Sequence, residues 1–265
     1  MRICRYCFVG GLHRSGTSLT ARLIGGLDGV SAIDGAPVPE NEGVYLQGAI
    51  PHTALHGRPA HFATDPAQHH VEGGPYDRLE VRDRLTADWA PWFDPDAPWR
   101  VEKSPVNLTR TRLYQQLFPL SQFVLVLRHP QRVAAALRKW GHDDTDRTVA
   151  HWIAAHDRLA DDLPHLHAAL VVRYEDLVAG PGAHLAAFAA YLDRPVPDAA
   201  PDGVRDGNAA YGDPGPLAAG TEARLARWGY AGDGRVLPWR PHVAHPLRTV
   251  RQAVVDALSD GSSGA

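Results

Sequence analysis

One short segment, Gly11–Ser18, most constrains the fold of this chain, because it joins an apolar run to a helical pattern through two glycines. The preceding run, Ile3–Val9, contains Cys, Tyr, Phe and Val and is typical of a buried strand. The following stretch, Ser18–Leu27, has a leucine at every fourth position, which indicates a helix. A strand, a glycine turn and a helix in this order predict a turn whose backbone N–H groups bind phosphate.

The turn itself departs from the ordinary nucleotide-binding loop. It reads G-L-H-R-S-G-T-S, with the spacing G-x-x-x-x-G-T-S. The ordinary loop has a lysine before its last residue, which reaches the β- and γ-phosphates, but Thr17 stands there and Arg14 lies inside the loop. The backbone cradle for an anion is therefore kept, while the lysine of ATP and GTP chemistry is lost. The alternative is a tight strand-to-helix turn with incidental Arg14 and Ser15.

Apolar runs alternate with helical patterns along the rest of the chain. Strands are expected at Trp99–Lys103, Phe123–Leu127 and Ala168–Val172. Helices are expected at Tyr76–Trp92, Leu108–Phe118, Arg132–Lys139, Thr148–Leu163 and His184–Leu192, and helix, irregular loop and helix within Glu222–Leu258. This alternation predicts an α/β chain with a three-layer P-loop-type fold, in which helices flank a mainly parallel central sheet.

Length and composition predict one domain. The chain has 265 residues, of which 44% are hydrophobic, and this suits a single domain over residues 1–258. Residues 38–74 are rich in Pro, Gly, His and Gln without periodicity, so we expect a functional loop that meets the substrate. Residues 259–265 are expected to form a disordered tail.

Charge and cysteine content bound the partners. The net charge of −3 argues against a general binder of nucleic acid or membrane surfaces. No apolar run approaches the roughly 18 residues of a membrane span, and no secretory signal opens the chain, so a cytoplasmic location is expected. Cys4 and Cys7 form a C-x-x-C pair without a second pair, which favours small buried hydrophobic residues over a zinc or redox site. Fifteen histidines show no metal-ligand spacing, so no metal is expected.

Four segments together resemble the sulfotransferase superfamily, and its bacterial branch most. Gly11–Ser18 resembles the 5′-phosphosulfate loop, which has a basic-Ser-Gly-Thr core. Glu102–Pro105 resembles the K-[ST]-P strand end of the family, and Phe123–Pro130 resembles the strand and arginine that hold the 3′-phosphate. Arg173–Leu177 resembles the Y-E-D-L element near the adenine. The four segments follow the family's order and spacing, and the resemblance extends over roughly Ile3–Leu192, most of the chain.

This resemblance implies a transferase. The donor is expected to be 3′-phosphoadenylyl sulfate (PAPS) and the product 3′-phosphoadenosine 5′-phosphate (PAP), without a metal. The acceptor is expected to be a hydroxyl or amine of a small molecule, carbohydrate or natural product. Lys103 would contact the sulfuryl oxygens. The donor contacts implied by the resemblance are Gly11, His13, Arg14, Ser15, Gly16, Thr17, Ser18, Arg128 and Tyr174.

One position departs from the family pattern. In many members, a serine eight residues after this arginine also binds the 3′-phosphate, whereas this chain has Ala136 there. Arg132, Arg138 or a basic C-terminal loop are the alternative contacts for this phosphate. For Tyr174, a place in the core beside a helix start is nearly as well supported as a place near the adenine.

The acceptor hydroxyl needs a general base, which is His or Glu in the family. Glu42 is the first candidate and Glu40 the second, because two close carboxylates can raise the pKa of one of them. The catalytic set is therefore expected to comprise Glu42, Glu40, Lys103 and Arg14. Weaker candidates for the base are His13, His52 and His56.

Aromatic and imidazole side chains are expected either at the acceptor entrance or in helix packing. They are His52, His56, His61, Phe62, His69 and His70, together with Trp89, Trp92, Trp140 and Trp152. Two other functions share the expected fold. A P-loop kinase-like phosphotransferase would need the loop lysine that Thr17 replaces. A non-catalytic nucleotide-binding domain is compatible with the departure at Ala136.

Overall fold

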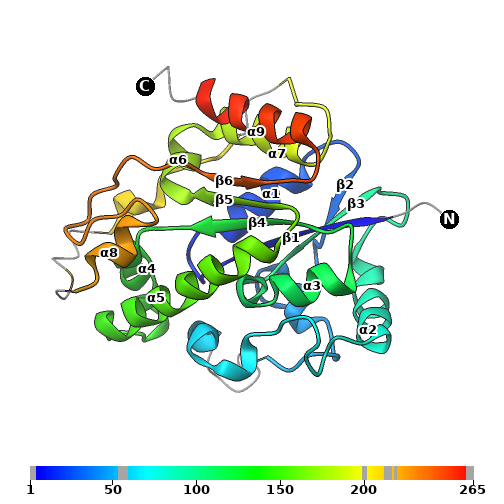
Figure 1. The fold of residues 1–265 in the computed structure, drawn as a ribbon, viewed down its shortest axis with the longest axis horizontal. Helices are drawn as coiled ribbons and strands as arrows, with labels where there is room; N and C mark the ends of the chain where they lie inside the picture. The colour runs from blue at the N-terminus through cyan, green and yellow to red at the C-terminus, as the bar shows by residue number, and fades with distance from the viewer. Residues whose placement is uncertain (1–3, 53–58, 199–201, 212–216, 218–219, 261–265) are drawn as a thin grey trace.

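A six-stranded sheet lies between two layers of helices in the computed structural model, which describes residues 4–52, 59–198, 202–211, 217 and 220–260 (Figure 1). The strand order is β2-β3-β1-β4-β5-β6, and only β6 runs antiparallel to its neighbour among these described strands. The strands are β1 Arg5–Gly11, β2 Val30–Ala32, β3 Trp99–Lys103, β4 Gln122–Leu127, β5 Ala169–Arg173 and β6 His242–Ala244. The predicted α/β class with a mainly parallel sheet is confirmed.

The register brings the ends of the central strands to one edge of the sheet. Val9 of β1 lies opposite Lys103, the last residue of β3, and Gly11 lies opposite Val126 near the end of β4. Leu127 of β4 in turn lies opposite Arg173, the last residue of β5. Segments that follow these parallel strands therefore meet at the edge where α/β sheets bind ligands.

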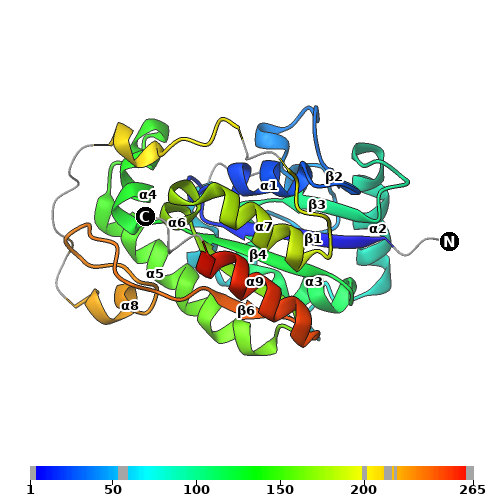
Figure 2. The same ribbon diagram turned by 90° about the horizontal axis from the view of Figure 1, so that it is seen from above.

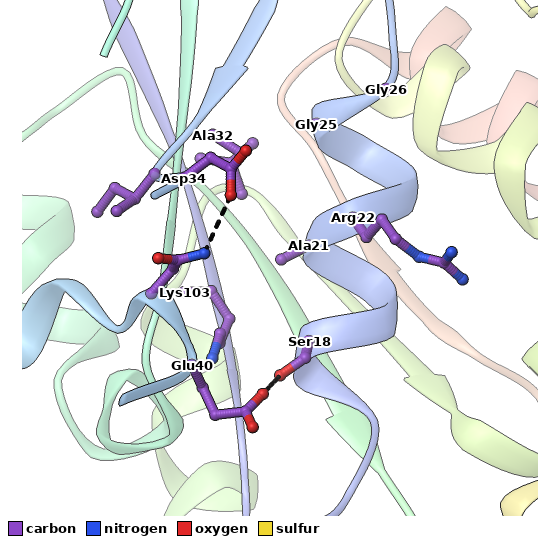
Figure 3. A pocket seen from close by; sticks show the side chains of 12 residues that line it. Ser18, Ala21, Arg22, Gly25, Gly26, Ala32, Asp34, Glu40 and Lys103 are labelled. Atoms are coloured by element: carbon purple, nitrogen blue, oxygen red, sulfur yellow. Dashed lines mark hydrogen bonds between the residues drawn. The ribbon is translucent and has the colours of Figure 1, made fainter. Parts of the chain in front are cut away.

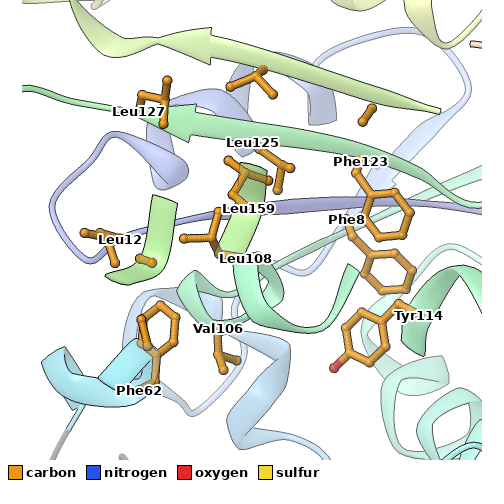
Figure 4. Packing of buried hydrophobic residues seen from close by; sticks show 14 of the residues in the cluster. Phe8, Leu12, Phe62, Val106, Leu108, Tyr114, Phe123, Leu125, Leu127 and Leu159 are labelled. Carbon is orange, nitrogen blue, oxygen red and sulfur yellow. The ribbon is translucent and has the colours of Figure 1, made fainter. Parts of the chain in front are cut away.

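Alternate side chains of each strand enter two separate cores. Tyr6 and Phe8 belong to one core, while Cys7 and Val9 belong to the other. Figure 4 shows the first core, where Phe8 lies between Phe123 and Tyr114, with ring centroids 5.8 and 4.6 Å away. The free Cys7 is fully buried and burial raises the pKa of its thiol, so it acts as a small apolar residue.

The helices cover both faces (Figure 2). On one face lie α1 Thr17–Gly25, α7 Pro181–Tyr191 and α9 Arg248–Asp260; on the other lie α2 Leu79–Trp89, α3 Thr111–Leu117, α4 Pro130–Leu137 and α5 Thr145–Asp162. The short helices α6 Tyr174–Ala179 and α8 Glu222–Ala226 follow β5 and precede β6. Every helix expected before residue 195 is present, with ends shifted by a few residues, as is usual for helix boundaries.

Two strands and one helix end differ from the expectation. The three-residue strands β2 and β6 are half-buried edge strands, so they carry no apolar run that a sequence pattern would show. Helix α9 continues to Asp260, two residues into the expected tail, because its buried Val254 docks on the core beneath α7. Residues 261–265 lie outside the described residues.

The segment over residues 38–74 contributes to the core. It forms the short 3-10 helices Pro39–Asn41, Gly43–Tyr45, Pro59–Thr64 and Pro66–Gln68. Val44, Ile50 and Phe62 are buried in the same core as Phe8. The apolar residues of this segment therefore anchor its polar ones against the sheet.

Candidate functional site

The turn between β1 and α1 has the backbone of an anion cradle. Helix α1 begins at Thr17, so the N–H groups of its first turn have no partner within the helix. The turn is closed by Ser15, whose N–H and hydroxyl both donate to the carbonyl of Leu12, at 3.0 and 2.6 Å. Arg14 and Gly16 have φ angles of 68° and 103°, in the left-handed region. Such a turn before a helix N-terminus suits a phosphate group.

Tyr174 and Arg128 pack against this turn from the neighbouring strands. A Cβ atom on Gly16 would lie 2.5 Å from a ring carbon of Tyr174, so only glycine fits there. The guanidinium of Arg128 lies over the same ring, with its Cζ 4.4 Å from the centroid. Tyr174 is thus buried at the site rather than in the core away from it.

Arg128 is held by three hydrogen bonds. Its Nη1 donates to the carbonyl of Arg14 at 2.7 Å, and its Nε and Nη2 donate to Oδ1 of Asn208 at 2.9 and 2.7 Å. Burial lowers the pKa of Arg128, although an arginine remains charged under ordinary conditions. The structure therefore places a buried positive charge beside the turn over Gly11–Ser18, which is called the phosphate turn below.

The segment that carries Asn208 was not expected at the site. The hydroxyl of Tyr174 donates to the carbonyl of Arg205 at 3.1 Å and accepts from the N–H of Gly207 at 2.7 Å. Arg132, a predicted alternative contact of the 3′-phosphate, donates to the carbonyl of Tyr211 at 2.7 Å and so contacts the same segment. The sequence gives no sign of these contacts, because residues 205–211 fall in a loop-rich region without a pattern.

Ala136, where the family pattern has a serine, and the predicted alternative Arg138 lie in α4 and directly after it. Ala136 is fully buried in α4. Arg138 donates to the hydroxyl of Thr145 at 3.2 Å on the surface.

On the opposite side of the turn, Lys103 and Glu42 form a buried pair. Lys103 Nζ lies 3.3 Å from Glu42 Oε1, and each residue is about 5% exposed. Burial raises the pKa of Glu42 to about 7, and the nearby charge of Lys103 opposes this rise. Lys103 therefore pairs with the predicted base and not with its neighbour in sequence, Glu102.

Glu40 lies at the mouth of a cavity beside this pair (Figure 3). It accepts a hydrogen bond from the Ser18 hydroxyl at 3.1 Å, and its φ of 53° is in the left-handed region. The cavity has a volume of about 550 Å³ and lies between α1, β2 and the end of β3. Its lining is Ser18, Ala21, Arg22, Gly25, Gly26, Ala32, Ile33, Asp34, Glu40, Asn41, Val101 and Lys103.

His13 turns towards the segment over residues 38–74. Its ring lies 5.8 Å from the rings of both Phe62 and Trp140, and it is 6% exposed. Neither ring nitrogen has a hydrogen-bond partner among the described residues. Burial lowers the pKa of His13 to about 3, with smaller contributions from His52 and Lys103, so the ring is neutral.

The remaining aromatic candidates separate into two groups. Trp140, whose ring lies under the guanidinium of Arg14, is beside the site, whereas Trp89 and Trp152 are fully buried in helix packing. His69 pairs with Asp162 at 3.0 Å, at the end of α5. His52 is buried against Tyr45, His70 packs on Tyr76 and His61 on His142. Trp92 is half-buried, and His56 lies outside the described residues.

The described residues contain neither a metal-binding cluster nor a membrane-spanning helix. No group of three or more His, Cys, Asp or Glu side chains there is arranged to hold a metal ion. Within the same part of the chain, every helix is too short or too polar to cross a lipid bilayer.

Comparison with known proteins points to one family. The model of the "Sulfotransferase family" matches residues 7–198, which contain the phosphate turn, Glu42, Lys103, Arg128 and Tyr174. No curated protein matches the chain.

Several solved structures are similar at low identity. A sulfotransferase of Mycobacterium tuberculosis H37Rv, STF1, is 19% identical over 74% of this chain and 69% of its own, with a TM-score of 0.46. A sulfotransferase of Alicyclobacillus acidocaldarius is 19% identical over 74% of this chain and 83% of its own, with a TM-score of 0.46. The sulfotransferase domain of the Synechococcus PCC 7002 olefin synthase is 15% identical over 98% of this chain and 95% of its own, with a TM-score of 0.47.

Proposed function

The chain belongs to the sulfotransferase family, and we propose that it transfers a sulfuryl group from PAPS to a hydroxyl of a small polyhydroxylated acceptor. The observation that carries this proposal is the buried pair of Lys103 and Glu42 beside a phosphate turn that lacks the lysine of ATP-using enzymes. A cation for the transferring group and a carboxyl with a pKa of about 7 are the two groups that the reaction needs.

The strand order supports separate places for donor and acceptor. The phosphate turn follows the central β1, Arg128 and Tyr174 follow β4 and β5 on one side, and Lys103 ends β3 on the other. A donor with its 5′-phosphate in the turn and its 3′-phosphate near Arg128 would direct its sulfuryl group towards Lys103. The cavity between α1 and β2 then lies on the acceptor side.

The donor end fits the residues present. The turn supplies backbone N–H groups and the hydroxyls of Thr17 and Ser18 for the 5′-phosphate. Arg128 supplies a buried planar cation, which suits a second phosphate. Asn208 holds the Arg128 guanidinium in position for that phosphate.

In the proposed reaction, the carboxylate of Glu42 takes the proton of the acceptor hydroxyl. The acceptor oxygen forms a bond to sulfur, and the bond from sulfur to the 5′-phosphate oxygen breaks, so that PAP leaves with the bonding electron pair. Lys103 stabilises the charge on the sulfuryl oxygens and on the bridging oxygen. Arg14, in the turn, adds a second positive charge close to the leaving phosphate.

The cavity lining supports a polyhydroxylated acceptor. Asp34, Glu40 and Asn41 offer oxygen atoms to hydroxyl donors, and none of the described residues that line the cavity is aromatic. Small residues of α1 allow the acceptor to approach the helix backbone closely.

Sulfur-labelled PAPS, offered with a panel of sugars, alcohols, phenols and amines, tests the proposal. Label should pass to sugars or other polyols, and the same compounds with every hydroxyl methylated should receive none. In calorimetry, PAP should bind at least about tenfold more tightly than ATP, with or without Mg²⁺. A Mg²⁺-dependent preference for ATP would instead support a phosphotransferase, and PAP binding without transfer to any acceptor would support a non-catalytic domain.

A further inference from the structure

The side chain of Glu102 is a fully buried carboxyl that the proposed reaction does not use. It is 0% exposed and lies on β3, one residue before Lys103. Lys103, its neighbour in sequence, pairs with Glu42 and not with the Glu102 carboxyl. Burying a carboxyl is costly unless its oxygens are hydrogen-bonded, so its contacts carry information.

Both oxygens of Glu102 accept short hydrogen bonds. The hydroxyl of Ser104 donates to Oε1 at 2.6 Å, and Nδ2 of Asn107 donates to Oε2 at 2.6 Å. Nδ2 of Asn107 also donates to the carbonyl of Val9 at 3.1 Å, which fixes the direction of the amide. Two donors facing the two oxygens are the arrangement of an ionised carboxylate.

The same contacts reach the turn that carries the proposed base. Oγ of Ser104 accepts the N–H of Val44 at 3.0 Å while its own hydrogen points to Glu102. A Cβ atom on Gly43 would lie 2.6 Å from the Glu102 carboxyl, so the backbone of the turn rests directly on this group. The Gly43 carbonyl accepts from Trp89 Nε1 at 2.9 Å, which holds the other side of the turn.

We propose that Glu102 is a positioning residue for the transfer reaction: its buried carboxylate fixes the turn of Glu42 through Ser104 and Gly43, and its charge faces the base. This inference rests on the transfer reaction proposed above. Asn107 extends the same contact to Val9, two residues before the phosphate turn, so one carboxylate links the base, Lys103 and the donor cradle.

The charges around Glu42 set the direction of the effect. Lys103 lowers the pKa of Glu42, whereas Glu102 and Glu40 raise it, and Glu42 in turn raises the pKa of Tyr45. Burial raises the pKa of Glu102 itself, while Ser104, Asn107, Lys103 and Arg110 lower it. Removing the negative charge of Glu102 should therefore lower the pKa of Glu42.

Glu102→Gln tests the effect of the Glu102 charge on Glu42, and Ser104→Ala tests the hydrogen bonds by which Ser104 joins Glu102 to Val44, here called the tether. Glu80→Gln, at an exposed position on α2, is the control. In the transfer assay, the rise of rate with pH should move to lower pH by about half a unit in Glu102→Gln. The rate at high pH should fall by about tenfold or more in Ser104→Ala, because the turn loses its anchor. A loss of rate in Glu102→Gln at every pH without a shift would overturn the charge effect, and an unchanged rate in Ser104→Ala would overturn the tether.

A second measurement needs no acceptor. Urea unfolding of Glu42→Gln at pH 5 and pH 8, made in the wild-type and Glu102→Gln backgrounds, reports how strongly Glu102 acts on Glu42. The pH-dependent gain in stability from Glu42→Gln should be smaller in the Glu102→Gln background, and an equal gain in both would overturn the coupling. If no acceptor is ever sulfated, the proposed function fails while this cycle still decides the role of Glu102.

Discussion

Replacing Glu42 by Gln should make the protein more stable and at the same time abolish transfer. Glu42 is buried, and burial raises its pKa to about 7 from the ordinary value of 4.5. Between these two values the unfolded chain loses its proton and the folded chain keeps it. The stability of the wild type therefore falls as the pH rises through this window. Gln cannot ionise, so the variant should escape this loss.

The size of the effect follows from the two pKa values. Proton linkage gives a loss of about 2.5 kcal/mol in the wild type between pH 5 and pH 8. The free energy of unfolding of Glu42→Gln relative to wild type should thus be greater at pH 8 than at pH 5 by up to this amount. The attraction of Lys103 is already contained in the pKa of Glu42, and the comparison between the two pH values cancels any effect of the substitution on packing that does not depend on pH.

Urea unfolding followed by tryptophan fluorescence measures this difference, and Glu40→Gln is the matched control. Glu40 lies in the same turn but is exposed, so its loss should change stability much less. In the transfer assay, Glu42→Gln should lose about a hundredfold or more in rate while PAP binding stays within about threefold. Equal stability changes at pH 5 and pH 8 would show that Glu42 is not a buried carboxyl with a raised pKa. Near-normal transfer would move the base to Glu40 or a histidine.

Two other substitutions test the turn itself. Gly16→Ala should lower PAP affinity by about tenfold or more, because the φ of Gly16 is 103° and the new Cβ atom would meet Tyr174. Gly35→Ala is the control measured by the same calorimetry: Gly35 also has a positive φ, but its Cβ atom would have no neighbour within 4 Å, so PAP binding should be unchanged. His13→Phe should raise the free energy of unfolding by about 1 kcal/mol, since it removes two buried nitrogen atoms without hydrogen-bond partners among the described residues. The variant should bind PAP but transfer more slowly, and lower stability in thermal unfolding would contradict this reasoning.

Much of the fold was predictable because its central strands are buried on both faces. Phe123–Leu127 appears as an apolar run since each of its residues contacts one of the two cores, whereas Trp99–Lys103 contributes only Trp99 and Val101 to a core. The edge strands β2 and β6 are three residues long and half-buried, so burial imposes no pattern on them.

The site was predictable only where a motif marks it. The turn, Lys103 and Arg128 follow strands, and the topology of a parallel sheet brings such positions together. Asn208 reaches Arg128 from 80 residues away through a segment without regular pattern. No role was predicted for Glu102, because the sequence does not show that Ser104 and Asn107 face it.

The tie between Tyr174 and residues 205–207 has a consequence for fragments of this chain. A fragment ending at residue 198 would contain the whole family match and five of the six described strands. It would lack Asn208, which holds the Arg128 guanidinium, and α9, which covers α7. Such a truncated protein would retain every recognisable motif and yet expose an apolar helix face and leave Arg128 without its amide support. The smallest active unit should therefore extend through α9, well beyond the last motif.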